Sequence, residues 1–479
     1  MAPINSLQRI IANASWLTGA RIIGDLANLA LFVALARRFG PAGIGEYAYS
    51  LGIAGLVFAG VSLGLGEYAI RECSRLSKTD QGLLVGRMLI LQCFGLSAAL
   101  LLLWIFLKNV NQTPQGSALV YILATQQVFI ALGKTLFSPA FGQQKMFGPV
   151  AVELSTRILG IIGAFAIIIF SNADMAMTLT PLAVASFMML VMAVHSCLSE
   201  SNNIRFSSNW IQFRQLIGDV APFAASLLLT FVTLRSSFII MKVMLGEETT
   251  GVYASGIKLM EAAVMPLSFI GLAVYPRLSQ LYRSGHDQFV DAGDKVLRVS
   301  ALIGVLISWF LFFFGPDIML FLLGARFHGS ESIVRSLAGC GFLFSISTLL
   351  VRFLLAADQQ YKRLIIQTAE TVVQVSTTII AIWFFSIYGA VVGLYAAVLI
   401  SIVLSLTVMH DRLRHQLRKS LVHIIFAIGM AVIFCLTVNA LLSSMIWSAG
   451  VSITVFLGMI YWLRFLPSSM LLAFQSTKS

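Results

Sequence analysis

Ten ionisable side chains lie inside segments of this sequence that are otherwise apolar. The bases are Arg21, Lys134, Arg157, Arg235, Lys258 and Arg352, and the acids are Asp25, Glu153, Glu261 and Glu370. Inside a bilayer, each exposed charge would cost roughly 2.5–3.5 kcal/mol at mid-depth. All of them together would cost about 25 kcal/mol or more, whereas folded proteins are stable by only about 5–15 kcal/mol. These side chains are therefore expected to face one another or water.

The spacing of these charges favours pairing within helices. Three pairs stand three or four residues apart: Arg21 with Asp25, Glu153 with Arg157, and Lys258 with Glu261. Residues at these spacings share one helix face and can partly neutralise each other. Two interpretations stay open for each pair: a structural ion pair, or part of a functional site.

The charges outside these pairs are mostly basic: Lys134, Arg235 and Arg352 stand against Glu370. Six bases against four acids leave a surplus of two positive charges. A cavity with surplus positive charge suits an anionic substrate such as a phosphate. The predicted substrate-binding residues are Arg21, Arg235, Lys258, Lys134 and Arg352. The predicted coupling or charge-pairing residues are Asp25, Glu153, Arg157, Glu261 and Glu370.

The composition indicates which elements must position these charges. Of the 479 residues, 58% are hydrophobic and only 11% charged, against about 25% charged in soluble domains. Apolar segments of roughly 20 residues, long enough to span a bilayer, predict an all-α integral membrane protein with about fourteen transmembrane helices. The predicted spans are 12–38, 44–68, 84–107, 117–140, 147–170, 176–198, 217–244, 250–275, 298–323, 332–356, 363–386, 389–409, 420–442 and 447–465. The first is expected to be a retained helix and not a cleaved signal.

The distribution of Lys and Arg predicts the orientation. With the N-terminus in the cytoplasm, the cytoplasmic side holds 20 of these residues and the opposite side 6. Positive residues favour the cytoplasmic side, so both termini are predicted to lie there. Anchoring to anionic lipid headgroups accounts for the net charge of +12, and no nucleic-acid partner is expected.

No signature of an enzyme, metal site or cofactor stands out in the sequence. The five cysteines are scattered without C-x-x-C spacing, and P-loop and HExxH motifs are missing. We therefore expect a non-enzyme without a cofactor, driven by an ion gradient, with H⁺ or Na⁺ as the coupling ion, by the membrane potential or by a substrate gradient. A membrane polymerase stays open as an alternative, although such enzymes usually carry a large external loop.

Two short motifs predict an internal repeat. The pattern G-x4-G-x-Y-A occurs at 40–48 and again at 246–254, offset by 206 residues. AFGQQKM at 140–146 similarly resembles AADQQYK at 356–362, offset by 216 residues. Two parallel six-helix lobes follow, related by an axis along the membrane normal, as in transporters that bind substrate between their lobes. The predicted lobes are 1–205 and 206–415, and the segment 416–479 adds two extra C-terminal helices.

Four stretches resemble a known family. The run 36–72 is similar to the junction of helices one and two in Wzx-type polysaccharide flippases, and 251–281 to their helix eight. The segment YGAVVGLYAA at 388–397 resembles the start of their helix twelve, and GARF at 324–327 the turn before helix ten. This resemblance runs through about residues 10–410 and places the chain beside the multidrug/oligosaccharidyl-lipid/polysaccharide (MOP) exporter superfamily.

The resemblance implies a V-shaped transporter that alternates between inward-open and outward-open states in the bacterial inner membrane. Its implied substrate is an undecaprenyl-pyrophosphate-linked oligosaccharide, flipped for O-antigen, exopolysaccharide or capsule export. Arg21 matches the family's helix-one arginine, Lys258 occupies a comparable helix-eight position, and Arg235 is placed by topology only. Implied partners are membrane lipids, a polysaccharide polymerase and a chain-length regulator.

Other functions stay open. A cation-coupled multidrug extruder with the same fold predicts a cavity rich in carboxylates and aromatic residues, whereas the surplus here is basic. A lipid II flippase is less favoured because helix two carries no Arg or Lys at mid-membrane depth. A scaffold within a polysaccharide synthesis complex is a further alternative.

Overall fold

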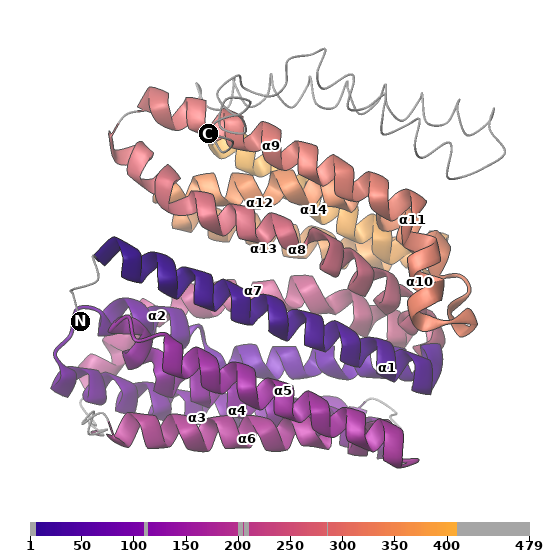
Figure 1. Ribbon diagram of the computed structural model, residues 1–479, viewed down its shortest axis with the longest axis horizontal. Coiled ribbons are helices and arrows are strands. Elements are labelled where there is room, and N and C mark those ends of the chain that lie inside the picture. Colours follow the sequence, from indigo (N-terminus) through magenta and orange to yellow (C-terminus); the bar gives the residue numbers. More distant parts are fainter. Residues whose placement is uncertain (1–5, 110–113, 200–204, 206–209, 285, 410–479) are drawn as a thin grey trace, which may run out of the picture. The chain divides into compact units, whose positions relative to one another are not determined.

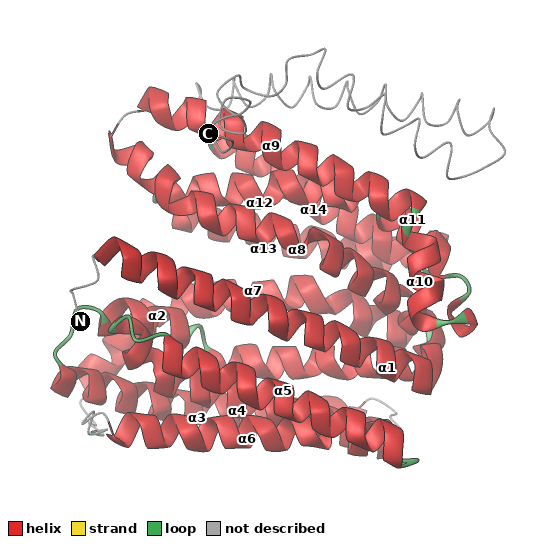
Figure 2. Ribbon diagram, in the orientation of Figure 1, coloured by secondary structure: helices red, strands yellow, loops and turns green. Residues whose placement is uncertain are grey.

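The computed structural model describes residues 6–109, 114–199, 205, 210–284 and 286–409. Over these residues the protein is α-helical, apart from loops and one short 3₁₀ turn (Figures 1 and 2). The all-α prediction is therefore confirmed. The two predicted C-terminal helices at 420–442 and 447–465 lie outside the described residues.

Every span predicted before residue 410 is helical in the structure. The helices are α1 (Ser6–Ser62), α2 (Leu65–Cys73), α3 (Lys78–Asn109), α4 (Pro114–Gly142), α5 (Phe147–Phe170), α6 (Met175–Ser199), α7 (Trp210–Leu245), α8 (Glu247–Ser284), α9 (His286–Phe313), α10 (Gly315–Leu323), α11 (Ser330–Leu337), α12 (Cys340–Ala356), α13 (Gln360–Phe385) and α14 (Tyr388–Val408), with the 3₁₀ turn η1 at Ala325–Phe327. The first predicted span and most of the second are joined in α1. The spans predicted at 298–323 and 332–356 are each broken into two helices.

Length and hydropathy mark the protein as a multi-pass membrane protein. Among the described helices, nine are long and apolar enough to cross a bilayer, and ten if the pair α11 and α12, bent by 42°, forms one broken span. The stretch Trp16–Cys73, which includes most of α1 and all of α2, counts once in this number although two predicted spans fall on it. The count is therefore compatible with the larger number predicted from the sequence.

Both copies of the G-x4-G-x-Y-A motif break the helical path at their first glycine. Gly40 has φ +70° and ψ −172°, and it kinks α1 directly before Pro41. Gly246 has φ +88° and separates α7 from α8. Positive φ is readily available only to glycine, so the first residue of the motif is the one that allows the chain to turn.

The second glycines of the two copies pack against each other. A Cβ on Gly45 would overlap the carbonyl oxygen of Glu247, and a Cβ on Gly251 would overlap that of Pro41. Glu247 follows Pro41 by 206 residues, as Gly251 follows Gly45. The contact is therefore reciprocal, as expected for two copies related by a pseudo-twofold axis.

The second predicted repeat is also visible, with a shifted alignment. Gln144 and Asp358 end their helices with φ +60° and +57°. In each turn the next amide donates five residues back, from Lys145 to Ala140 at 2.9 Å and from Gln359 to Leu354 at 3.0 Å, which is a Schellman arrangement. The equivalent residues are 214 apart, not the 216 of the sequence motif, because the turn and not the glutamine pair sets the register.

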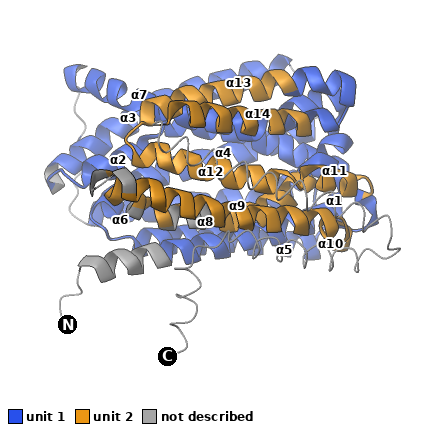
Figure 3. Ribbon diagram, turned by 90° about the horizontal axis from the view of Figure 1, so that it is seen from above, with its two compact units in different colours: residues 1–254, 322–327, 378–390 blue, residues 255–321, 328–377, 391–479 orange. Residues whose placement is uncertain are grey.

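The chain divides into two compact units (Figure 3). Unit 1 comprises 1–254, 322–327 and 378–390, and unit 2 comprises 255–321, 328–377 and 391–479. Helix α7 lies in unit 1, so the boundary between the compact units differs from the predicted lobe boundary at residue 205. The lobes were defined by the repeat and not by compactness, and their limits stay a prediction.

Two adjacent arginines of α1 donate to helix ends within unit 1. Arg38 donates to the carbonyl oxygens of Ile168, Ser171 and Ala173 at 2.5, 2.6 and 3.0 Å, at the C-terminus of α5. Arg37 donates to the carbonyl of Leu322 at 2.7 Å, at the end of α10. The last carbonyls of a helix lack partners and carry partial negative charge, so both arginines stabilise a helix end.

Candidate anion-binding site

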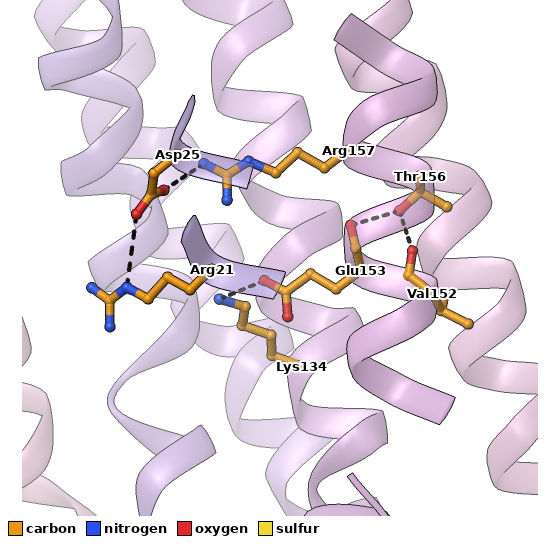
Figure 4. Close-up of polar contacts among 7 residues, drawn as sticks. All are labelled: Arg21, Asp25, Lys134, Val152, Glu153, Thr156 and Arg157. Carbon is orange, nitrogen blue, oxygen red and sulfur yellow. Dashed lines mark hydrogen bonds and ion pairs between the residues drawn. The ribbon is translucent and has the colours of Figure 1, made fainter. Parts of the chain in front are cut away.

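Five of the predicted charges lie in unit 1 and form two groups of ion pairs, drawn in Figure 4. Asp25 of α1 pairs with Arg157 of α5, at 2.9 Å between Oδ1 and Nη2. Its other oxygen, Oδ2, lies 3.9 Å from Nε of Arg21. The predicted pair within α1 therefore exists, but the closer partner of Asp25 comes from a different helix.

The second group joins α4 to α5. Lys134 of α4 lies 3.3 Å from the carboxylate of Glu153. The expected pairing of Glu153 with Arg157 inside α5 is replaced by cross-helix pairs, since Arg157 bonds to Asp25 instead. Lys134, for which the sequence spacing predicted no partner on its own helix, therefore has one on α5.

A glycine allows Arg157 to reach α1. A Cβ on Gly24 would stand 2.6 Å from Nη1 and 3.1 Å from Cζ of Arg157, so the guanidinium lies directly over the helix backbone. With its amide oxygen facing Arg157, Asn28 accepts a hydrogen bond from Nε at 3.2 Å and another from Nη2. Gly24, Asp25 and Asn28 together form the binding site of the Arg157 guanidinium.

Both groups are accessible, and together they carry net positive charge. The side chains of Arg21 and Lys134 are 62% and 46% exposed, and Arg157, the least exposed of the five, still reaches 32%. Three bases against two acids give a net charge of +1. Because charges facing lipid would be costly, we interpret this accessible surface as one that meets water or a polar ligand.

Arg235 of α7 differs from these charges because it forms no ion pair among the described residues. Its stem lies against α1, with Cβ 3.6 Å from a Cβ built on Gly52 and Cγ 3.6 Å from one built on Gly55. Its guanidinium carbon stands 6.0 Å from the centre of the Phe238 ring. None of the ion pairs among the described residues involves Arg235, so its half-buried charge is available to a ligand.

The remaining predicted charges lie in unit 2. Lys258 and Glu261 pair at 3.4 Å, as their spacing predicted. Glu370 pairs with Arg363 of the same helix at 3.2 Å, so it is not the unpaired acid that the spacing indicated. Arg352 of α12 lies beside α8, where its Nε is 3.5 Å from a Cβ built on Gly271.

Sequence reasoning missed Gly24, Asn28 and Arg363 as members of these sites. Asn28 stands one helical turn after Asp25, and this spacing on an apolar helix was the signal available for it. Gly24 gave no comparable signal, because its role depends on a residue 133 positions later in the chain. In the described part of the chain, no group of three or more His, Cys, Asp or Glu residues could hold a metal ion.

The fold is that of a known class of membrane transporter. A lipid II flippase in an inward closed conformation aligns with a TM-score of 0.68 at 14% identity, covering 93% of this chain and 98% of its own. A eukaryotic MATE transporter aligns with a TM-score of 0.59 at 12% identity, covering 87% and 99%. These identities show the fold alone, which the chain shares with these two proteins and with a solved multidrug resistance transporter described as a MATE protein of the MOP superfamily.

The family is shown by the sequence match. The profile of a family described as polysaccharide biosynthesis protein matches residues 10–282. This is more than half of the 479 residues, and the chain belongs to that family. The resemblance to polysaccharide exporters is thereby confirmed.

Two relatives carry the provisional name O-antigen transporter. The protein from Shigella flexneri is 23% identical over 300 residues, which cover 57% of this chain and 67% of the relative. The protein from Shigella dysenteriae is 24% identical over 287 residues, which cover 59% and 71%.

Proposed function

We propose that this protein flips a lipid-linked oligosaccharide, carried on undecaprenyl pyrophosphate, from the cytoplasmic to the periplasmic leaflet of a bacterial inner membrane. The family match and the two relatives named as O-antigen transporters support this substrate class. The protein acts as a transporter and not as an enzyme, and both of its termini lie in the cytoplasm. Export of O-antigen, exopolysaccharide or capsule would depend on it.

The observation that carries this proposal is the available Arg235. A half-buried arginine without an ionic partner among the described residues is costly unless an anion binds to it. A pyrophosphate supplies closely spaced oxygens, and a guanidinium can bind two of them at once. Arg21, which is 62% exposed and 3.9 Å from Asp25, also has donors left for such an anion.

The other predicted residues take supporting roles in this proposal. Lys134 and Arg157 are held by carboxylates and adjust the charge around the site, and Lys258 is held by Glu261. The movement of H⁺ or Na⁺ would drive transport, with Asp25 as the first candidate to exchange it. A polymerase and a chain-length regulator would act on the flipped product.

The test is complementation of a deletion strain whose surface polysaccharide is lost. Arg235→Ala should lower the amount of surface polysaccharide roughly 10- to 100-fold, since a hydrogen bond to a charged group contributes about 1.5–3 kcal/mol. Arg235→Lys should restore part of it, because the charge stays while the two-point contact is lost. Arg75→Ala, a matched control on the exposed surface, should complement fully at the same membrane abundance.

Two outcomes would contradict the proposal. A deletion strain with normal surface polysaccharide and lost resistance to cationic dyes would indicate a multidrug extruder. A strain that stops making cell wall while its surface polysaccharide is intact would indicate a lipid II flippase.

A further inference from the structure

Asp25 has two arginine neighbours, and its carboxylate oxygens lie at different distances from them. Its Oδ1 accepts from Arg157 at 2.9 Å, within hydrogen-bond distance, while its Oδ2 is 3.9 Å from Nε of Arg21. Asn28 binds Arg157 as well and gives this guanidinium a second acceptor. Arg157 is therefore the cation that neutralises Asp25, and Arg21 is only weakly engaged.

We propose that Gly24 and Arg157 are positioning residues that keep Arg21 available for the anionic headgroup of the substrate. This inference rests on the proposed function. Arg157 binds Oδ1 of Asp25 at 2.9 Å, and Asp25 consequently does not close onto Arg21. In Figure 4 the terminal nitrogens of Arg21 point away from Asp25, free to donate to phosphate oxygens.

The guanidinium of Arg157 can occupy its position only because residue 24 has no side chain. In Gly24→Ala, the added methyl group would stand 2.6 Å from Nη1 and 3.1 Å from Cζ of Arg157. The guanidinium is the flexible end of its side chain, whereas the α1 backbone is fixed by its helical hydrogen bonds. Arg157 therefore moves, and Asp25 loses its nearest cation.

The carboxylate would then turn to Arg21. The two residues are four apart on α1, a spacing at which an Asp and an Arg can pair directly. A paired Arg21 has fewer donors and less net charge to offer a phosphate. The methyl group of Gly24→Ala thus acts indirectly, through Arg157 and Asp25, on Arg21, which binds the phosphate.

The experiment measures binding of undecaprenyl pyrophosphate to the purified full chain in nanodiscs. Gly24→Ala should weaken binding about tenfold relative to the unaltered protein, the effect expected when one charge-assisted contact is lost. Gly19→Ala is the matched control, since it lies on the same helix and a Cβ there meets no atom within 4 Å. Its affinity should be unchanged.

Two combined variants distinguish positioning from mere damage to the fold. Gly24→Ala with Asp25→Asn should recover most of the lost affinity, because no carboxylate is left to occupy Arg21. Arg157→Gln should weaken binding as much as Gly24→Ala, and joining the two should add nothing further. A structural defect would not be rescued by a second substitution, and independent defects would add up.

The outcomes separate this inference from the proposed function. Tight binding by the unaltered protein together with equal affinities of Gly24→Ala and Gly19→Ala would overturn the inference alone. Failure of Asp25→Asn to rescue would overturn it as well. If the unaltered protein does not bind the pyrophosphate lipid, the inference and the proposed function both fail. Should Gly24→Ala not accumulate, Arg157→Gln with and without Asp25→Asn makes the same test.

Discussion

The two copies of the G-x4-G-x-Y-A motif have the same backbone but are followed by different side chains. Gly40 and Gly246 both take positive φ, and Gly45 and Gly251 contact each other's copy reciprocally. At the same offset of 206 residues, however, Gly52 and Gly55 of the first copy correspond to Lys258 and Glu261 of the second. The copies agree where the chain must turn and pack closely, and they differ one to two turns further along.

This difference makes the charge pattern asymmetric between the two copies, although their backbones are alike. In the first copy, the glycines leave room for α7 to bring the stem of Arg235 against α1. In the second copy, the corresponding positions carry a lysine and a glutamate that pair with each other at 3.4 Å. One copy thus accommodates an available cation, and the other holds a neutralised pair.

The largest effect is expected where the copies are alike. Gly45→Val and Gly251→Val each place a branched side chain against a backbone carbonyl, which cannot rotate away. Each should lower the free energy of unfolding by about 3 kcal/mol, the upper part of the range for overpacking. The two losses should be similar, because the contact is reciprocal. Thermal unfolding in detergent measures both, with Gly148→Val as control, since a Cβ at Gly148 meets no atom within 4 Å.

An intermediate effect is expected where the copies differ. Gly55→Glu gives the first copy the residue of the second and places a carboxylate next to the stem of Arg235. Neutralising this arginine should reduce surface polysaccharide about tenfold, as loss of one charge-assisted contact would. Gly55→Gln has nearly the same volume and no charge, and should retain more export. Equal export by the two variants would mean that volume, and not charge, separates the copies here.

The smallest effect is expected in the second copy itself. Glu261→Gln removes the partner of Lys258 from a pair whose side chains are 32% and 38% exposed. Helical pairs at this spacing contribute roughly 0.2–0.5 kcal/mol, so the unfolding free energy should change by no more than that. Chemical denaturation of the purified protein provides the measurement. A loss as large as that of Gly251→Val would show that the pair holds the second copy together.

The sequence was sufficient for the helices and for the inventory of charges. Twenty-residue apolar segments give helices in any membrane-spanning chain, because the backbone must satisfy its own hydrogen bonds in lipid. The glycines of the repeated motif were informative for a similar reason, since their backbone conformation is largely a local property.

The partners of the charges were not predictable in the same way. Spacing along a helix reports which residues share a face, but not which helix lies opposite that face. Arg157 and Asp25 are 132 residues apart in the sequence, and their contact depends on how α5 packs against α1. Gly24 would be judged a weak point of its helix from propensity alone. Gly24 is useful because its missing side chain leaves room for the guanidinium of Arg157.

The arginines that hold the ends of α5 and α10 have a consequence for biogenesis. Arg37 and Arg38 emerge from the ribosome with the first helix, on what the predicted topology makes its translocated end. The carbonyls of residues 168–173 that receive Arg38 are synthesised more than a hundred residues later, and the carbonyl of Leu322 that receives Arg37 later still. In the predicted topology, the first hairpin would be oriented by its cytoplasmic charges against these two arginines. Arg37 and Arg38 both have their partners only after Leu322 has been synthesised.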